Sequence, residues 1–476
     1  GTAINSTGAD GTVAIGYEAS QALTSGANQV SIGYQAGKAL TTAANSVFIG
    51  YQAGLEHTGG NNIAIGDRAF YSTNAGSNSL ASTQNVAIGN RAMGGIFTDG
   101  KVEGTVAIGY LALGTATMGG SNYNIAIGHE SQYSNGGGQN VAIGGNTMRA
   151  ADGTETGNVA IGTSVMDALN NDGSDYNTVV GNYAVRGGTG VISHNTVMGY
   201  QGMDQVGNHS SIKNTFIGYD AGGGIYAGDV TGNVGIGYQS LHGPMNGANY
   251  NVALGYVALS VVTTGDTNIG IGVSAGTDIT TGSDNTIVGS SAGVLMTTTS
   301  NTVLIGKSAG AAINSADANG TIAIGYEAGA AITSAQQNTL VGYEAGKSIT
   351  TGGYNAIFGY QAGDALTIGD WNIAIGRNAL GAEDVGRGTV AIGMNSLLQQ
   401  NSDSDNEITN NVAVGLNTGY SVITGQGLTL IGSYAGELVR NQSYVTAIGM
   451  EALRYNNLGS HTVGVGYRAG YYATGS

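Results

Sequence analysis

A glycine that closes a short apolar run recurs along the whole chain and constrains the fold more than any other feature. These anchor glycines number 26, from Gly16 and Gly33 through to Gly449 and Gly466. Their mean spacing is 18 residues, and 12 of the 25 intervals are 17 residues long. A period this short and regular is typical of a solenoid, in which each repeat stacks on its neighbours. We therefore expect one elongated repeat domain over residues 1–476, as a segment of a longer fibre.

The composition argues against helical, collagen-like and membrane-spanning alternatives. The 476 residues include 86 Gly, one Pro and no Cys, and only 9% are charged. Glycine inside every repeat would cost about 1 kcal/mol each time in a helix, and it does not recur at every third position as in collagen. No run of about 18 apolar residues exists, so we expect no membrane insertion. The net charge of −16 comes without a basic cluster, which argues against nucleic acid as a partner.

The residues before each anchor glycine predict a short strand. The residue just before the glycine is apolar in all 26 repeats, and the residue two positions earlier is often Val or Ile, which is the period-two spacing of a strand. We predict that the side chain before the glycine faces a continuous core, as at Ile15, Ile88, Ile324 and Ile375. The predicted fold is all-β, a parallel β-solenoid (β-roll) of about 26 short coils of 17–19 residues each.

The other face of the predicted strand is small. The residue between the two apolar positions is often alanine, as at Ala14 and Ala142. Glycine in a strand interior is unfavourable unless another backbone comes close. This face therefore predicts a close approach, either to the opposite wall of the same coil or to a neighbouring chain. A minority of repeats, such as those closed by Gly218 and Gly289, carry a larger residue here, for which burial of both faces is the simpler account.

Two further repeat positions predict the corners of the coil. Four residues before the anchor is Asn in 16 of 26 repeats, as at Asn62, Asn124, Asn251 and Asn372. Asn tolerates left-handed geometry and suits a corner, and in register these side chains would form an amide ladder. In the shortest repeats an apolar residue seven positions after the anchor predicts a second strand and a return turn; examples are Leu23, Leu40, Ile332, Ile349 and Leu366.

The stretches "GTVAIGYEA", "NNIAIG", "QNVAIGN" and "NTVLIGKSAG" resemble the YadA-like head repeats of trimeric autotransporter adhesins. They resemble still more closely the N-T-A-I-G-Y-Q-A repeats of phage tail fibres. The resemblance covers the chain from about Thr12 to about Gly470. It implies a left-handed parallel β-roll in which three chains associate side by side. The period of 17 or more is longer than that of the adhesin repeat, which favours a fibre over an autotransporter.

Signals for catalysis are weak against this periodic background. The glycine-rich segments 270–276 and 464–470 are repeat copies without the strand, loop and long helix of a phosphate-binding motif. The six His residues occupy different repeat positions and have no metal-ligand spacing. No Ser is paired with a placed His and Asp. We expect no catalytic residues and no cofactor, so the protein is predicted not to be an enzyme.

One insertion has some metal character. Asp403, Asp405 and Glu407 alternate within the 22-residue interval before Gly415, and alternating acidic oxygens resemble the start of a calcium loop. The glycine and the distant bidentate Glu of such a loop are missing, so a solvated insertion is the favoured interpretation and calcium the weak one. The same holds for Asp172 and Asp175.

Several functional classes remain open. A structural fibre shaft needs only the repeats, whereas an adhesin also needs an irregular exposed surface, which the long intervals 66–89 and 393–415 could supply. A polysaccharide-cleaving tailspike needs paired carboxylates in a groove, and the acidic residues are sparse. An ice-binding face is a further alternative, but its Thr pairs are interrupted in the middle third of the chain.

We expect a structural fibre or tail-fibre shaft that presents host-attachment surfaces, outside the cell or on a virion. A trimeric autotransporter adhesin and a self-assembling extracellular filament are the alternatives. The repeat pattern reaches Gly1 and Gly470, so the terminal coils would present unpaired strand edges. We therefore expect a homo-oligomer, which the resemblance implies to be a trimer, with a cell-surface receptor or glycan as a further partner.

Overall fold

A computed structural model describes residues 9–71, 81–97, 100–118, 123–134, 137–150, 154–168, 171, 173–405, 407–456 and 459–472. Gly1 and Asp172, which entered two of the predictions, lie outside the described residues. The chain divides into two compact units, residues 1–247 and residues 248–476. Each unit is by itself a parallel β-solenoid, and each is described by itself below.

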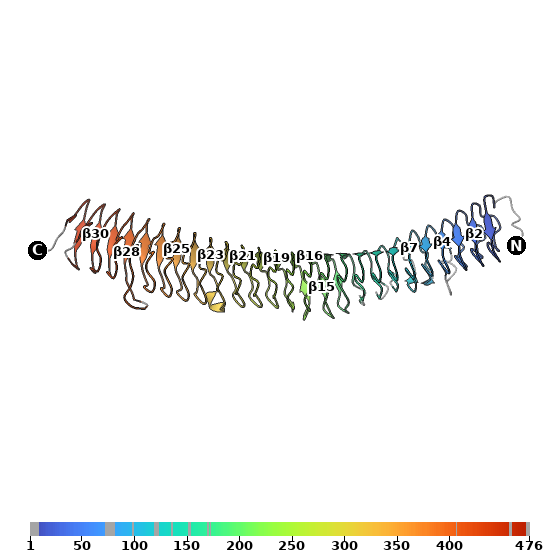
Figure 1. The fold of residues 1–476 in the computed structure, drawn as a ribbon, viewed down its shortest axis with the longest axis horizontal. Coiled ribbons are helices and arrows are strands. Elements are labelled where there is room, and N and C mark those ends of the chain that lie inside the picture. The colour runs from blue at the N-terminus through green and yellow to red at the C-terminus, as the bar shows by residue number, and fades with distance from the viewer. Residues whose placement is uncertain are drawn as a thin grey trace. The chain divides into compact units, whose positions relative to one another are not determined.

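The first unit is a stack of coils, each of which contributes one three-residue strand to the main sheet. Figure 1 shows these strands following one another in chain order from blue to green. The strands are β1 (Val13–Ile15), β2 (Val30–Ile32), β3 (Val47–Ile49), β4 (Ile63–Ile65), β5 (Val86–Ile88), β7 (Val106–Ile108), β9 (Ile125–Ile127), β10 (Val141–Ile143), β11 (Val159–Ile161), β12 (Thr178–Val180), β14 (Thr196–Met198), β16 (Thr215–Ile217) and β18 (Val234–Ile236).

The second unit repeats this plan, and its strands run on to red in Figure 1. They are β19 (Val252–Leu254), β20 (Ile269–Ile271), β21 (Thr286–Val288), β22 (Val303–Ile305), β23 (Ile322–Ile324), β24 (Thr339–Val341), β25 (Ala356–Phe358), β26 (Ile373–Ile375), β27 (Val390–Ile392), β28 (Val412–Val414), β29 (Thr429–Ile431), β30 (Thr446–Ile448) and β31 (Val463–Val465). One 3-10 helix, η2 (Ala316–Ala318), is capped by the Ser315 side chain.

Neighbouring strands of each unit pair in parallel and in register, so that equivalent repeat positions lie side by side. Val13 pairs with Val30 in the first unit, for example, and Ile324 pairs with Val341 in the second. A strand ends immediately before every one of the 26 anchor glycines. The predicted all-β parallel β-solenoid with one coil per anchor glycine is therefore confirmed.

The orientation of the strand is opposite to the one predicted. In most strands the middle residue is buried and the two flanking residues are partly or fully exposed, as in β23, where Ala323 is buried and Ile324 is not. The placement of the residue before the glycine in the core of its own coil is therefore wrong. The affected assignments are Ile15 and Ile375, which are exposed, and Ile88 and Ile324, which are half-buried. The middle residue of the strand, which is often alanine, faces the interior of the coil instead.

The anchor glycine is required by the stacking of successive coils. Every anchor glycine has a φ between +124° and +146°, which L side chains rarely adopt. A Cβ placed on Gly33 would also lie 2.3 Å from the carbonyl oxygen of Gly50 in the next coil. The close approach at the anchor glycine is thus to the next coil of the same chain, which the prediction did not include. The alanines of the small face, such as Ala142, are buried inside the coil.

Besides the residue seven positions after the anchor, the core of most coils holds a bulky side chain at one of two further positions. Where the middle residue of the strand is alanine, the residue four positions after the anchor is commonly large and buried, as for Ala374 with Leu380. Where the middle residue is large, that later residue is commonly glycine, as for Phe48 with Gly54, where an added Cβ would meet the ring at 2.7 Å. Close packing of the interior requires the combined side-chain volume of these two positions to stay similar from coil to coil.

The predicted asparagine ladder is present at the corner that precedes the strand. The Oδ1 atom of Asn62 accepts from the backbone N–H of Asn85 in the next coil at 3.0 Å. Its Nδ2 donates to the carbonyls of Gly59 and Ser82. Equivalent bonds to the next coil are made by Asn124, Asn251 and Asn372. The left-handed residue of this corner is the one before the asparagine, however; Asn61, for example, has φ +59°.

The predicted second strand is wrong for the shortest repeats. Leu23, Leu40, Ile332, Ile349 and Leu366 are buried as expected, but they lie directly after a turn and outside any strand. Short second strands are described only in longer repeats of the first unit: β6 (Ile96–Phe97) with β8 (Thr117–Met118), and β13 (Ile192–Ser193), β15 (Ser211–Ile212) and β17 (Val230–Thr231) together. The return path of a short coil needs no ladder of its own because the turns hydrogen-bond to the next coil.

Candidate functional site

The most extensive candidate surface is formed by the first and third residues of the main-sheet strands, which we call the outer sheet face. All 52 of these positions, two in each of 26 strands, are described. They hold only Val, Ile, Leu, Met, Phe, Thr and Ala. No charged side chain interrupts the outer sheet face in either unit.

Much of the outer sheet face is open to solvent in the single chain. Phe358 and Ile375 are each 38% exposed although both lie well inside the second unit. Other exposed members are Val13, Ile15, Ile63, Met198 and Ile236 in the first unit, and Ile269, Ile305, Ile373, Val412, Ile431, Ile448, Val463 and Val465 in the second. Apolar patches that extend this far are rare on monomeric proteins and mark association surfaces.

Stacked tyrosines follow the outer sheet face along one margin, because Tyr often comes directly after the anchor glycine. Three such stacks have ring centroids 5.0–5.3 Å apart: Tyr17 with Tyr34 and Tyr51, Tyr200 with Tyr219 and Tyr238, and Tyr326 with Tyr343 and Tyr360. Within a stack each ring lies against the next, and every tyrosine of the three stacks except Tyr326 is still exposed. Tyrosine is enriched at protein interfaces for this combination of apolar body and polar tip.

A row of polar side chains lies one residue further on. Gln35 donates to Glu18 at 2.7 Å and Gln52 donates to Gln35 at 3.0 Å, so the row links consecutive coils. The Lys38 ammonium beside Glu18 holds the pKa of that carboxyl below its usual range. In the second unit Lys347 bridges Glu327 and Glu344 at 2.5 and 3.0 Å. These exposed pairs set the register of neighbouring coils more than they stabilise them.

The weak calcium candidate is not brought together as a ligand set. Glu407 turns back on its own loop, where its carboxylate accepts from the backbone N–H of Asp403 at 3.0 Å and from the Gln426 side chain. Asp403 and Asp405 are exposed. In the second candidate, Asp175 accepts from the backbone N–H of Thr156. Within the described ranges no three His, Asp or Glu side chains gather as they would around a metal ion.

Glu383, which the sequence did not single out, places a buried carboxyl group in the coil before that loop. Glu383 is fully buried and accepts from Gly386 N–H at 2.7 Å, from Gln400 Nε2 at 2.8 Å and from Ser402 Oγ at 3.0 Å. Gln400 in turn accepts from Asn411. Because donors from two coils bond to both carboxyl oxygens of Glu383, we interpret this cluster as a structural joint.

No protein-family model and no curated protein sequence matches the chain. The fold and its surfaces define the class instead: the protein is a parallel β-solenoid repeat protein with an uncharged outer sheet face. In the part of the chain that the structure describes, no helix is long and apolar enough to cross a membrane.

Proposed function

We propose that the protein is a structural fibre shaft whose copies associate side by side through the outer sheet face. The observation that carries this proposal is the absence of charge from all 52 positions of that face. A single chain would leave Ile, Val and Phe side chains in water, at about 25 cal/mol per Å² of apolar area. A second copy has an outer sheet face with the same spacing between strands and no charged side chains, so it can cover these residues.

The proposal includes the assembly that the repeat resemblance implies, a trimer. In a trimer each copy offers its outer sheet face to the other two, and the stacked tyrosines lie at the margin of the contact. The shaft is built into a longer fibre, outside the cell or on a virion, and it carries or presents attachment surfaces. Its length then follows from the number of coils, which is the property that a spacer needs.

Two pairs of variants test the lateral contact. The double variant Ile305→Lys with Ile375→Lys places two charges on the outer sheet face of the second unit. The matched control is Asn301→Lys with Gln337→Lys, at the exposed corner position where Lys213 occurs naturally. Light scattering and negative-stain electron microscopy should show that the first variant dissociates into thinner particles while the control stays assembled. Equal assembly of both variants would overturn the proposed contact.

A further inference from the structure

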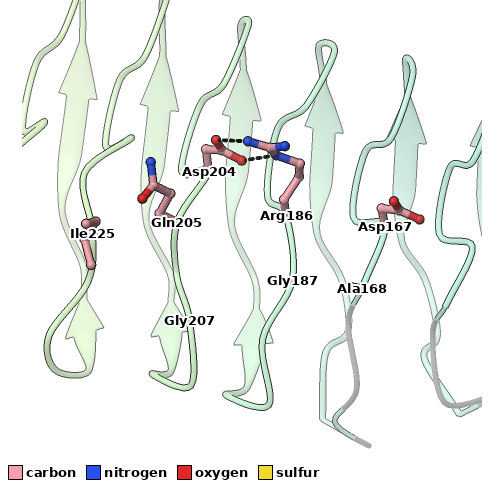
Figure 2. A pocket seen from close by; sticks show the side chains of 8 residues that line it. All are labelled: Asp167, Ala168, Arg186, Gly187, Asp204, Gln205, Gly207 and Ile225. Atoms are coloured by element: carbon pink, nitrogen blue, oxygen red, sulfur yellow. Dashed lines mark hydrogen bonds and ion pairs between the residues drawn. The ribbon is translucent and has the colours of Figure 1, made fainter.

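A ladder of alternating charge lies away from the outer sheet face, on four consecutive coils of the first unit. The residue five positions after the anchor is Arg149, Asp167, Arg186 and Asp204 in turn. Arg186 is paired with Asp204 through two bonds, Nε to Oδ1 at 2.5 Å and Nη2 to Oδ2 at 2.6 Å, as Figure 2 shows. Arg149 pairs with Glu130 at 3.1 Å.

A shallow groove of about 520 Å³ opens beside this ladder. It exists because the next residues of two coils, Ala168 and Gly187, have almost no side chain, so backbone forms part of the groove surface. Gly207 and the exposed Ile225 complete the lining together with Asp167, Arg186, Asp204 and Gln205 (Figure 2). Charged, amide and apolar groups therefore meet in one concave surface.

Asp167 lines this groove and has a carboxyl oxygen without a hydrogen-bond donor. Its Oδ1 atom is buried and has no hydrogen-bond partner. The nearest cation, Arg149 Nε, is 3.6 Å away, which makes an ion pair but is too long for a hydrogen bond. Burial raises the pKa of Asp167, against the opposing effect of Arg149 and Arg186. A buried acceptor without a donor costs about 1–3 kcal/mol, so a rotation of the Asp167 carboxyl group that brings this oxygen to the groove surface would allow a ligand hydroxyl to satisfy it.

The charges of the groove select against ionic ligands. An anion would meet the carboxylates of Asp167 and Asp204, while Arg186 is already paired with Asp204. A cation at Asp167 would lie next to Arg149 and Arg186, which both act on that carboxyl. What remains is a ligand that donates neutral hydroxyls and also offers an apolar face to Ile225, which is 64% exposed.

We propose that this groove binds a neutral saccharide, with Asp167 accepting a hydroxyl and Gln205 providing a second polar contact. The groove would be one of the attachment surfaces of the proposed shaft, with a saccharide as its ligand. Only this role as an attachment surface rests on the proposed function. The shaft itself is tested by particle mass, without any glycan, so the two proposals fail separately.

A glycan array probed with the full-length chain tests the inference. The array carries neutral, sialylated, sulfated and amino-sugar oligosaccharides. We expect binding confined to the neutral class. Ala168→Trp, which fills the groove from an exposed position, should reduce it at least tenfold.

The matched control is Ala365→Trp, at the same repeat position of a coil in the second unit. It should bind as the wild type does, and both variants should keep the wild-type circular dichroism spectrum. The proposal is overturned by an array without bound glycans, by binding to the acidic glycans, or by neutral-glycan binding that Ala168→Trp leaves unchanged. If Ala168→Trp does not fold, Asp167→Ala replaces it, with the same tenfold loss expected.

Discussion

Gly325 lies directly against the carbonyl of Gly342 in the next coil: a Cβ on Gly325 would be 2.1 Å from that oxygen. Gly325 also has a φ of +140°. Both facts exclude any other residue, because the strain of the left-handed region adds to a contact with backbone that cannot move aside. The close contact between successive coils, rather than a turn, is what requires glycine here.

We therefore predict that Gly325→Ala destabilises the second unit by at least about 2 kcal/mol. Gly145→Ala is the control, since an added Cβ at Gly145 meets nothing within 4 Å. It should change stability by less than about 0.5 kcal/mol. Chemical denaturation of the two variants checks this. Equal loss in both would mean that the stacking contact does not explain the anchor glycines.

Substitution by Asp at two adjacent residues of β23 should have different effects, on folding at one residue and on assembly at the other. Ala323→Asp buries an unpaired carboxylate inside the coil and should cost more than about 4 kcal/mol. Ile324→Asp points outward between Ile305 and Val341. It should leave the β-sheet spectrum intact but weaken assembly. Circular dichroism and light scattering distinguish the two effects; loss of the folded spectrum in Ile324→Asp alone would show that the orientation of the strand is the reverse.

The exchange of bulk between the middle of the strand and the position four residues after the anchor predicts a compensating pair. Ala374→Ile overpacks the coil by about 1–3 kcal/mol, and Leu380→Gly leaves a cavity that costs about 3–5 kcal/mol. Together they recreate the Ile357 and Gly363 pair of the preceding coil. The double variant should be more stable than the sum of the single changes by at least about 1 kcal/mol. Simple additivity in a double-mutant cycle would argue against a shared volume.

Asp364 should make stability depend on pH. Burial raises its pKa above the ordinary value of 3.8, so the folded state holds the proton more tightly and ionisation costs stability above the raised pKa. Asp364→Asn should therefore melt at a higher temperature than the wild type at pH 7. This gain should shrink as the pH falls from the raised folded pKa towards 3.8, where both states of the wild type become protonated.

The half-buried Glu327 provides the opposite sign for comparison. Lys347 holds the pKa of Glu327 below its usual range, so its contribution is present at neutral pH and is lost as the pH falls through the lowered pKa. Glu327→Gln should cause a small loss of stability at pH 7 that vanishes in acid. A shift in melting temperature of the same sign and pH profile in both variants would contradict these assignments.

Much of the fold follows from the spacing of the anchor glycines, because a strand before each of them stacks in one register. The side of the strand that faces inward does not follow. Ala323 and Ile324 satisfy the same alternation, and the usual expectation that larger apolar side chains are buried within their own chain selects the wrong one. Which face of the strand turns inward is set by the way the chain closes through its corners, which is a property of the closed coil and not of the strand pattern.

The groove was missed for a different reason. Arg186 and Asp204 are 18 residues apart in the chain and become neighbours only when the coils are stacked in register. An alignment of the repeats on their anchor glycines places both five positions after the anchor and would have revealed the alternating ladder. The unfilled acceptor on Asp167 depends on burial and distances, which no alignment contains.

The mass of the chain in solution tests the central claim most directly. If the outer sheet face is the lateral contact of a shaft, sedimentation equilibrium at micromolar concentration should give three times the chain mass of 47.4 kDa, or a higher assembly of such trimers. A stable 47.4 kDa monomer with no larger species would contradict the account, because the uncharged face would then be exposed to water without a partner.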